Sequence, residues 1–218
     1  MNENAEKNRD HRYFDQAAAT WEENPLRIAL ARSVSASIMR EVPLSRDMAA
    51  LEFGCGTGLV SVGLAGRVGR ILAVDTARGM LDVLERKILE SGIPDLTTRQ
   101  MDLTADAFAG DRFDNVISSM TIHHVKDVPG LLRVFNRLLN PGGYLALADL
   151  DTEDGGFHGN IPDVFHFGFE RSVFAGWMDA DGFSDIRLTT AHVMKKPHAR
   201  TGAATEFPVF LAKGRKPA

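Results

Sequence analysis

The acidic and glycine residues between positions 52 and 58 have the types and the spacing of a nucleotide-binding turn. Glu52 closes an apolar run, and Gly54, Gly56 and Gly58 follow at every second position. Glycine accepts positive φ and lets a ligand approach the main chain closely. Between a predicted strand and a predicted helix, this turn therefore favours a nucleotide-like ligand lying against the backbone.

The spacing of the glycines narrows the class of nucleotide. The dinucleotide fingerprint G-x-G-x-x-G fits Gly54 and Gly56, but its last position is Leu59 in this chain. A phosphate-binding P-loop would need Gly-Lys-Ser or Gly-Lys-Thr, which the turn lacks. Because Glu52 would also repel a phosphate, the turn favours a ligand with a cationic or hydroxyl-bearing face.

A second carboxylate, Asp75, follows the glycine turn by about twenty residues and ends another apolar run. A carboxylate at a strand end can accept hydrogen bonds from both hydroxyl groups of a ribose. Capping of the next turn is the alternative explanation for Asp75. Dinucleotide enzymes share this feature, so Asp75 indicates a ribose without selecting the cofactor.

Alternating strand and helix patterns place these residues at strand ends. Parallel strands with crossover helices are predicted from strand patterns at residues 48–53, 70–75, 97–101, 113–118 and 144–149 and helix patterns at residues 13–40, 60–68, 80–91 and 128–139. Residues 164–181 also have a helical pattern. Two strands, 186–194 and 207–212, then follow with no helix between them, which favours antiparallel pairing. We expect an α/β, doubly wound, mostly parallel seven-stranded sheet with an antiparallel C-terminal strand pair and helices on both faces.

Taken together, residues 11–213 resemble the class I S-adenosylmethionine-dependent methyltransferases. Residues 52–58 match that family's acidic-x-Gly-x-Gly-x-Gly motif. The paired His123 and His124 match the segment after its fourth strand, and the turn at residues 139–143 is typical of the family. The resemblance implies S-adenosyl-L-methionine as cofactor and S-adenosyl-L-homocysteine as product. It also implies methyl transfer to a small-molecule acceptor by in-line displacement.

The resemblance further implies which residues contact the cofactor. The turn with Glu52 would hold the methionine part, Asp75 the ribose, and Asp102 with Leu103 the adenine. Met80 would lie on an adenine face, or would equally serve as plain core. The expected cofactor-binding residues are Tyr13, Glu52, Gly54, Cys55, Gly56, Gly58, Asp75, Thr76, Met80, Asp102, Leu103, Ser118 and Ser119.

A methyl group on a sulfonium is already activated, so positioning of the nucleophile is the main task of the protein. An oxygen or nitrogen nucleophile also needs a base. The candidates near predicted strand ends are His123, His124, Asp149, His158 and His166, each of which could instead be a hydrogen-bonded loop residue. The histidines lack H-x-x-x-H spacing, so we expect no metal.

The chain is expected to form a single domain with three functional parts. Residues 1–45 would be an N-terminal helical lid over the cofactor, and residues 46–218 the S-adenosylmethionine-binding core. Residues 151–180 would be an insertion on the substrate side. Phe14 and Trp21 could instead anchor the first helix to the core.

Composition excludes some partners and locations. The net charge of −4 and the absence of a Lys/Arg run make nucleic acid an unlikely partner, and no apolar run has the length of a membrane span. The single cysteine, Cys55, suits a reducing, cytoplasmic setting, and residues 1–10 are too polar for a signal peptide. The sequence carries no signal of an oligomeric state.

Two other functions remain open from the sequence. One is an NAD(P)-dependent oxidoreductase of Rossmann type, which Leu59 and the expected antiparallel pair oppose. The other is a non-catalytic regulator that binds the cofactor on the methyltransferase fold. A measurement of which cofactor binds distinguishes the oxidoreductase from the methyltransferase. A measurement of turnover distinguishes the regulator from an active enzyme.

Overall fold

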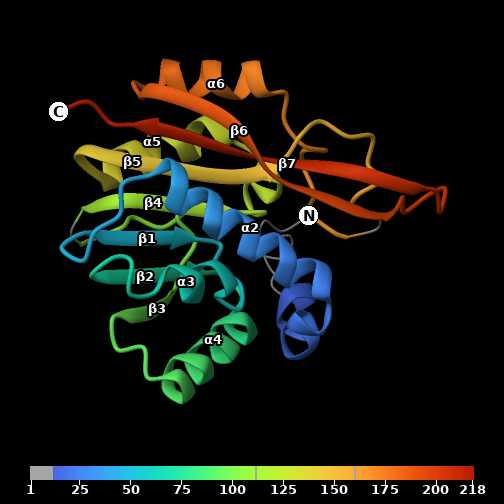
Figure 1. The fold of residues 1–218 in the computed structure, drawn as a ribbon, viewed down its shortest axis with the longest axis horizontal. Helices are drawn as coiled ribbons and strands as arrows, with labels where there is room; N and C mark the ends of the chain where they lie inside the picture. The colour runs from blue at the N-terminus through green and yellow to red at the C-terminus, as the bar shows by residue number, and fades with distance from the viewer. Residues whose placement is uncertain (1–11, 111, 160) are drawn as a thin grey trace.

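The computed structural model describes residues 12–110, 112–159 and 161–218. These residues contain a seven-stranded sheet with the strand order β3-β2-β1-β4-β5-β7-β6 (Figure 1). The first five strands pair in parallel, and β7 runs antiparallel between β5 and β6. The strands are β1 (Ala49–Phe53), β2 (Arg70–Asp75), β3 (Leu96–Gln100), β4 (Phe113–Ser119), β5 (Leu139–Leu150), β6 (Ser184–Pro197) and β7 (Ala204–Arg215). The predicted fold class is confirmed.

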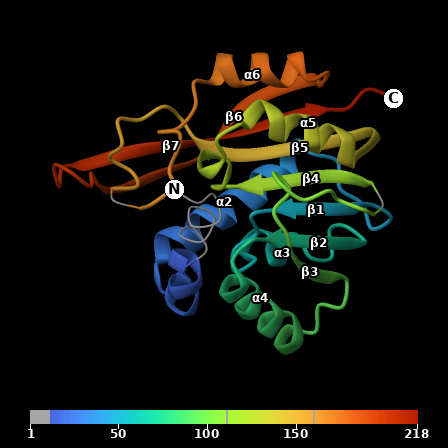
Figure 2. The same cartoon turned by 180° about the vertical axis from the view of Figure 1, so that it is seen from behind.

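Helices cover both faces of the sheet. One face packs against α2 (Pro25–Glu41), α3 (Leu59–Leu64) and α4 (Arg78–Ser91). The other face packs against α5 (Val128–Leu138) and α6 (Arg171–Ala180). The view in Figure 1 has α2 in front of the sheet, and the reverse view in Figure 2 has α5 in front. Since helices lie on both sides, every residue of β1 is buried, as expected for a central parallel strand.

The prediction of one continuous N-terminal helix over residues 13–40 is wrong. Residues 12–17 are helical, a 3-10 helix η1 (Ala18–Glu23) follows, and α2 then begins at Pro25. Asn24 separates the two helices, and its side chain accepts a hydrogen bond from the backbone N–H of Leu26. Proline fits the first turn of a helix but not its interior, so the restart at Pro25 has a local cause.

Other boundaries also differ from the sequence pattern, and three of them have a clear effect on the fold. The predicted helix of residues 60–68 ends at Leu64, because Gly66 adopts a φ of 77°. The predicted turn at residues 139–143 is part of β5, which starts by pairing with β4. The predicted helix of residues 164–181 begins only at Arg171, after Gly168 with a φ of 73°. Glu170 caps this shorter helix by accepting from the N–H groups of Ser172 and Val173.

The segment between β5 and α6, residues 151–170, is a long loop that we call the excursion, and it contacts the β6–β7 hairpin. Asp154 accepts a hydrogen bond from His198 Nε2 over 2.9 Å, and the N–H of Ala199 donates to the carbonyl of Gly156 over 2.8 Å. Figure 1 shows the hairpin extending past the edge of the sheet beside this orange loop.

Residues 1–10, for which the sequence predicts no signal peptide, lie outside the described residues. Within the described ranges, none of the helices combines the length and the apolar character needed to cross a bilayer.

Candidate active site

The strand order reverses between β1 and β4, and a pocket lies at the carboxyl ends of the strands at this point. Open α/β sheets bind their ligands at such a switch point. The pocket is lined by the turn after β1, the end of β2, the residue after β3 and the loop after β4. Residues of the N-terminal segment and α2 complete it.

The turn after β1 needs glycine at three positions for different reasons. Gly54, Gly56 and Gly58 all have positive φ, at 66°, 53° and 77°. A Cβ at Gly54 would overlap the side chain of Thr121, and one at Gly58 would overlap Leu84. A Cβ at Gly56 would meet no atom within 4 Å. Gly56 therefore leaves open space beside the pocket, whereas Gly58 allows close packing outside it.

Glu52 lines the pocket although only 2% of its surface is exposed. Its carboxylate accepts a hydrogen bond from the hydroxyl of Ser61. Burial raises the pKa of Glu52 to about 7, and the hydrogen bond from Ser61 only partly offsets this effect. A cationic group bound in the pocket would stabilise the ionised carboxylate.

Asp75, at the end of β2, also lines the pocket. Its Oδ2 accepts from the N–H of Gly56 over 2.7 Å, and its Oδ1 accepts from the N–H of Ala77 over 2.9 Å. Asp75 thus caps the turn, the alternative that the sequence left open. Each carboxylate oxygen has a second lone pair, so capping and acceptance from a ribose are compatible. Thr76 lines the pocket beside it.

The expected adenine contacts are divided between the pocket and its surroundings. Met80 lines the pocket, and so does Met101, which the sequence reasoning did not select. Asp102 lies outside the lining and accepts from the N–H and hydroxyl of Thr104 over 2.9 and 2.6 Å. Leu103 is buried in the core on the α5 side. The adenine role of Asp102 and Leu103 stays a prediction.

The end of β4 and the loop after it line the pocket next to the glycine turn. Ser119, Met120 and Thr121 line the pocket, and Thr121 Oγ1 donates to the carbonyl of Gly54 over 3.1 Å. Ser118 lies outside the lining and donates to the carbonyl of Phe53 over 2.8 Å. It therefore fixes β4 against β1 at the pocket edge.

Residues of the N-terminal segment lie over the pocket. Phe14 and Trp21 line it, and the guanidinium carbon of Arg27 lies 3.6 Å from the Trp21 ring centroid. Arg27 also lines the pocket, and sequence reasoning missed it because a lone arginine on a helix carries no signal. Tyr13 packs edge-on against Phe14, with centroids 5.2 Å apart, and is not part of the lining.

Two contacts fasten this segment to α4. Asp15 Oδ1 accepts from the N–H of Gly79 over 2.7 Å, and Lys87 Nζ lies 2.6 Å from Glu22 Oε1. These contacts join the N-terminal segment to the helix that follows Asp75. The N-terminal segment is thus fixed beside the pocket by contacts with α4.

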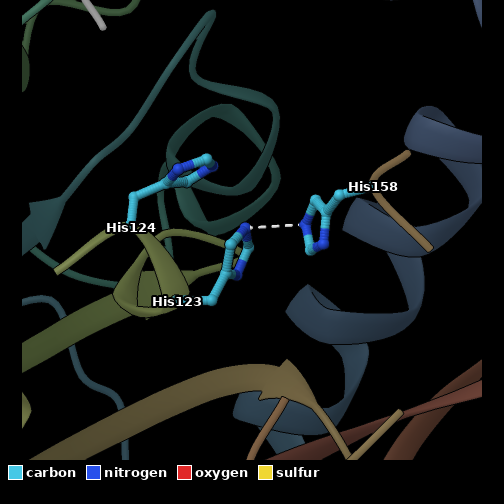
Figure 3. A group of neighbouring side chains, drawn as sticks. All are labelled: His123, His124 and His158. Atoms are coloured by element: carbon cyan, nitrogen blue, oxygen red, sulfur yellow. Dashed lines mark hydrogen bonds between the residues drawn. The ribbon is translucent and has the colours of Figure 1, made fainter. Parts of the chain in front are cut away.

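Four of the five candidate catalytic residues lie together. His123 Nδ1 lies 2.7 Å from Oδ1 of the fully buried Asp149. Burial alone would raise the pKa of Asp149, but the adjacent His123 and backbone N–H groups outweigh this effect and lower it. His158 Nε2 lies 2.9 Å from His123 Nε2 (Figure 3). Burial, followed by the proximity of His123, lowers the pKa of His158 to about 3.

His124 is the member of this group that lines the pocket. Its Nδ1 donates to the carbonyl of Asp163 over 2.9 Å, so Nε2 carries the lone pair. Burial and the neighbouring His123 lower the pKa of His124 to about 4. His166 lies apart, because its Nε2 donates to the carbonyl of Val125 over 2.9 Å.

Cys55 lines the pocket within the glycine turn and is buried. Burial raises the pKa of its thiol well above the ordinary value. The thiolate is the nucleophilic form, so this environment fits a small residue in a tight turn.

The pocket has the features that an adenosyl ligand with an ammonium group requires. Glu52 offers a buried acid, Asp75 a carboxylate at a strand end, and Met80 an apolar face. Thr57 Oγ1 is buried in the same turn and has no hydrogen-bond partner among the described residues. A buried hydroxyl without a partner is costly, so a ligand with polar groups would satisfy this turn.

Comparisons with known proteins agree with the geometry. Residues 51–147 match the family described as Methyltransferase domain. An uncharacterized methyltransferase of Schizosaccharomyces pombe is 36% identical over 167 residues, covering 70% of this chain and 57% of the relative. The ubiquinone biosynthesis O-methyltransferase of Methylocella silvestris is 32% identical, covering 62% of this chain and 56% of the relative. The chain therefore spans little more than half the length of these relatives.

A solved structure gives the same result for the fold. Phosphoethanolamine N-methyltransferase 2 of Haemonchus contortus, in complex with S-adenosyl-L-methionine, superposes with a TM-score of 0.69 at 18% identity. The match covers 84% of this chain and 52% of that chain. The sheet and its antiparallel pair are thus those of an established fold.

Proposed function

This chain carries a class I S-adenosylmethionine-dependent methyltransferase domain, and from that premise we propose that the protein methylates a small-molecule acceptor. One relative is named for O-methylation in ubiquinone biosynthesis, which is consistent with a small acceptor. S-adenosylmethionine would supply an activated methyl group on a sulfonium.

The observation that carries this proposal is the buried acid at the floor of the pocket. Glu52 is 2% exposed, lines the pocket and has a pKa raised to about 7 by burial. A buried carboxyl group is costly unless a partner balances its charge. The amino group of the cofactor's methionine part would be such a partner, and the ribose hydroxyls would donate to Asp75.

The residues of the chain would act mainly by positioning the reactants. The N-terminal segment, which we propose as a lid of residues 1–45, would exclude water from the pocket through Phe14 and Trp21. The acceptor would lie beside His124, which lines the pocket next to the loop after β4. A lid of this kind leaves room for a small acceptor rather than a folded polymer.

The domain organisation and location follow the same proposal. Residues 46–218 would form the cofactor-binding core, and residues 151–180 would border the acceptor. The single buried cysteine, Cys55, supports a cytoplasmic setting.

Titration calorimetry with S-adenosyl-L-homocysteine tests the proposal. We expect one binding site per chain and no comparable heat with NADH. Asp75→Ala should weaken binding by about 1–3 kcal/mol, the scale of a lost charged hydrogen bond. Asp185→Ala should leave binding unchanged, because Asp185 is exposed and pairs with Lys213 on β7.

Binding of NADH without binding of S-adenosyl-L-homocysteine would contradict the proposal and favour the oxidoreductase alternative. Tight binding of the product, together with no methyl transfer to any acceptor in a broad panel, would favour the non-catalytic regulator instead.

A further inference from the structure

Three histidines gather at the edge of the pocket, and we call them the His trio: His123, His124 and His158. The first two belong to the 3-10 helix η2 (Ile122–His124), and the third lies in the excursion after β5. One ring nitrogen of each lies within 4.8 Å of the others. Figure 3 shows His123 between the other two rings.

The hydrogen bonds of the trio determine which nitrogens are available. Nδ1 of His123 is held by Asp149 over 2.7 Å, and Nδ1 of His124 is held by the carbonyl of Asp163 over 2.9 Å. Both rings therefore present Nε2 to the centre of the group. His158 also directs Nε2 there, 2.9 Å from Nε2 of His123.

Metal-binding histidines show the same outer contacts. A ligating imidazole usually donates its other N–H to a carboxylate or a backbone carbonyl, which fixes the ring and its tautomer. His123 has the carboxylate of Asp149 in this position, and His124 has the carbonyl of Asp163. Nδ1 of His158 is buried without a hydrogen-bond partner among the described residues.

The charge balance of the trio favours a cation. Asp149 has an exposed fraction of 0%, and in the described part of the chain its ion-pair partner is His123. A buried carboxylate needs a compensating positive charge. A cation bound to the far nitrogen of His123 would supply that charge.

The spacing also suits a small transition metal. Zinc binds imidazole nitrogen at about 2.0–2.1 Å in tetrahedral geometry, which separates neighbouring ligand nitrogens by about 3.3 Å. The trio has nitrogens 2.9 Å apart at its closest pair and no more than 4.8 Å apart overall. Side-chain shifts of roughly 1 Å or less would therefore place the three nitrogens at three corners of a tetrahedron around one ion.

We propose that the His trio binds one divalent transition-metal ion of the zinc type, with His123, His124 and His158 as ligands and Asp149 orienting His123. Imidazole ligands select zinc, copper, nickel or iron rather than magnesium or calcium. Three protein ligands leave a fourth position, as in catalytic rather than structural zinc sites. His124 also lines the cofactor pocket, so the ion would lie at its border. The proposal does not depend on methyl transfer.

The competing explanation is a hydrogen-bonded histidine pair with no ion. In that case His123 and His158 share one proton between their Nε2 atoms, and His124 packs beside them. The two explanations differ in measurable metal content.

The test uses full-length protein without a histidine tag, freed of metal by a chelator. We expect calorimetry with Zn²⁺ to give about one ion per chain and an increase in the melting temperature. Co²⁺ in place of Zn²⁺ should give the intense visible absorption of a tetrahedral site. A stoichiometry near zero, or no visible absorption with Co²⁺, would overturn the proposal.

Single substitutions test which residues bind the ion. His158→Ala should weaken Zn²⁺ binding about 100-fold or more, and Asp149→Asn about 10- to 100-fold, as is typical of the groups that orient a ligand. His192→Ala is the matched control, because His192 lies on β6 and contacts Ser33 instead of the trio. Equal Zn²⁺ affinity in the His158 and His192 variants would place the ion elsewhere and reject the site.

Discussion

At the scale of single residues, the site depends on two carboxylates in unlike environments. Glu52 is buried inside β1, and burial raises its pKa to about 7. Asp75 ends β2, where two backbone N–H groups already stabilise its charge. A bound cation would therefore favour the ionised form of Glu52, whereas Asp75 is fixed in position as a hydrogen-bond acceptor.

Glu52 should make the stability of the ligand-free protein decrease as pH rises. Its pKa is about 7 in the folded chain and about 4.5 when unfolded, so the folded state holds an extra proton between these values. The proton contributes its full stabilisation below about pH 4.5, and this contribution is lost as the pH rises through about 7. We expect Glu52→Gln to match the wild type near pH 4.5 and to exceed it by about 3 kcal/mol at pH 8, measured by urea unfolding.

The same substitution should have the opposite effect on ligand binding. Glu52→Gln should weaken binding of S-adenosyl-L-homocysteine at pH 8, because a neutral amide attracts an ammonium group less than a carboxylate does. A variant that is less stable at pH 8, or that binds as tightly as the wild type, would contradict the role of Glu52.

At the scale of elements, the glycine turn and the N-terminal segment both line the pocket. The turn joins β1 to α3, and the segment is fastened to α4 through Asp15 and Glu22. Both therefore depend on helices that pack on the same face of the sheet.

A pair of glycine substitutions should separate binding from stability. Gly56→Ala places a methyl group in open space, at a cost of about 1–2 kcal/mol for left-handed backbone. It should weaken S-adenosyl-L-homocysteine binding at least tenfold. Gly58→Ala should cost about 1–3 kcal/mol more in stability, because its methyl group overlaps Leu84. Calorimetry and thermal unfolding compare the two, and the reverse order of effects would contradict the assignment.

Release of the N-terminal segment should speed ligand dissociation. Asp15→Ala removes the hydrogen bond to Gly79, worth about 1 kcal/mol, so the dissociation rate should rise about fivefold. Trp21 lines the pocket and provides a fluorescence signal for stopped-flow measurement. Asp82→Ala is the control, because Asp82 on α4 pairs with Arg78 instead. An equal rate in both variants would reject the lid.

The elements also show how far the sequence could predict the structure. The strand at residues 70–75 is found as predicted, since it is a continuous apolar run ending in Asp75. The helix expected from residue 164 starts at Arg171, because Gly168 and the cap at Glu170 outweigh the aromatic periodicity before them. Such boundaries are fixed by caps and by glycines with positive φ, which a hydrophobic periodicity does not include.

The sequence likewise predicted only part of the candidate site. Glu52, Gly54, Gly56 and Asp75 line the pocket, and their spacing along the chain identified them. The contact between His123 and His158 could not be predicted from the sequence, because they lie 35 positions apart, with α5 and β5 between them. Arg27 and Met101 were missed, since neither belongs to a motif.

At the scale of the whole molecule, the C-terminal hairpin supports the site from a distance. Lys196 Nζ on β6 donates to the carbonyl of Phe157 over 2.6 Å, directly before His158. The antiparallel pair thus has a structural consequence beyond closing the sheet. It holds the excursion that brings His158 to the loop after β4.

The central claim is that the pocket at the ends of β1, β2 and β4 holds the methyl donor. A crystal structure of the protein with S-adenosyl-L-homocysteine tests it most directly. We predict the amino group of the ligand beside Glu52, the ribose hydroxyls on Asp75 and the thioether beneath Trp21. An ordered ligand bound elsewhere, with this pocket empty, would contradict the claim.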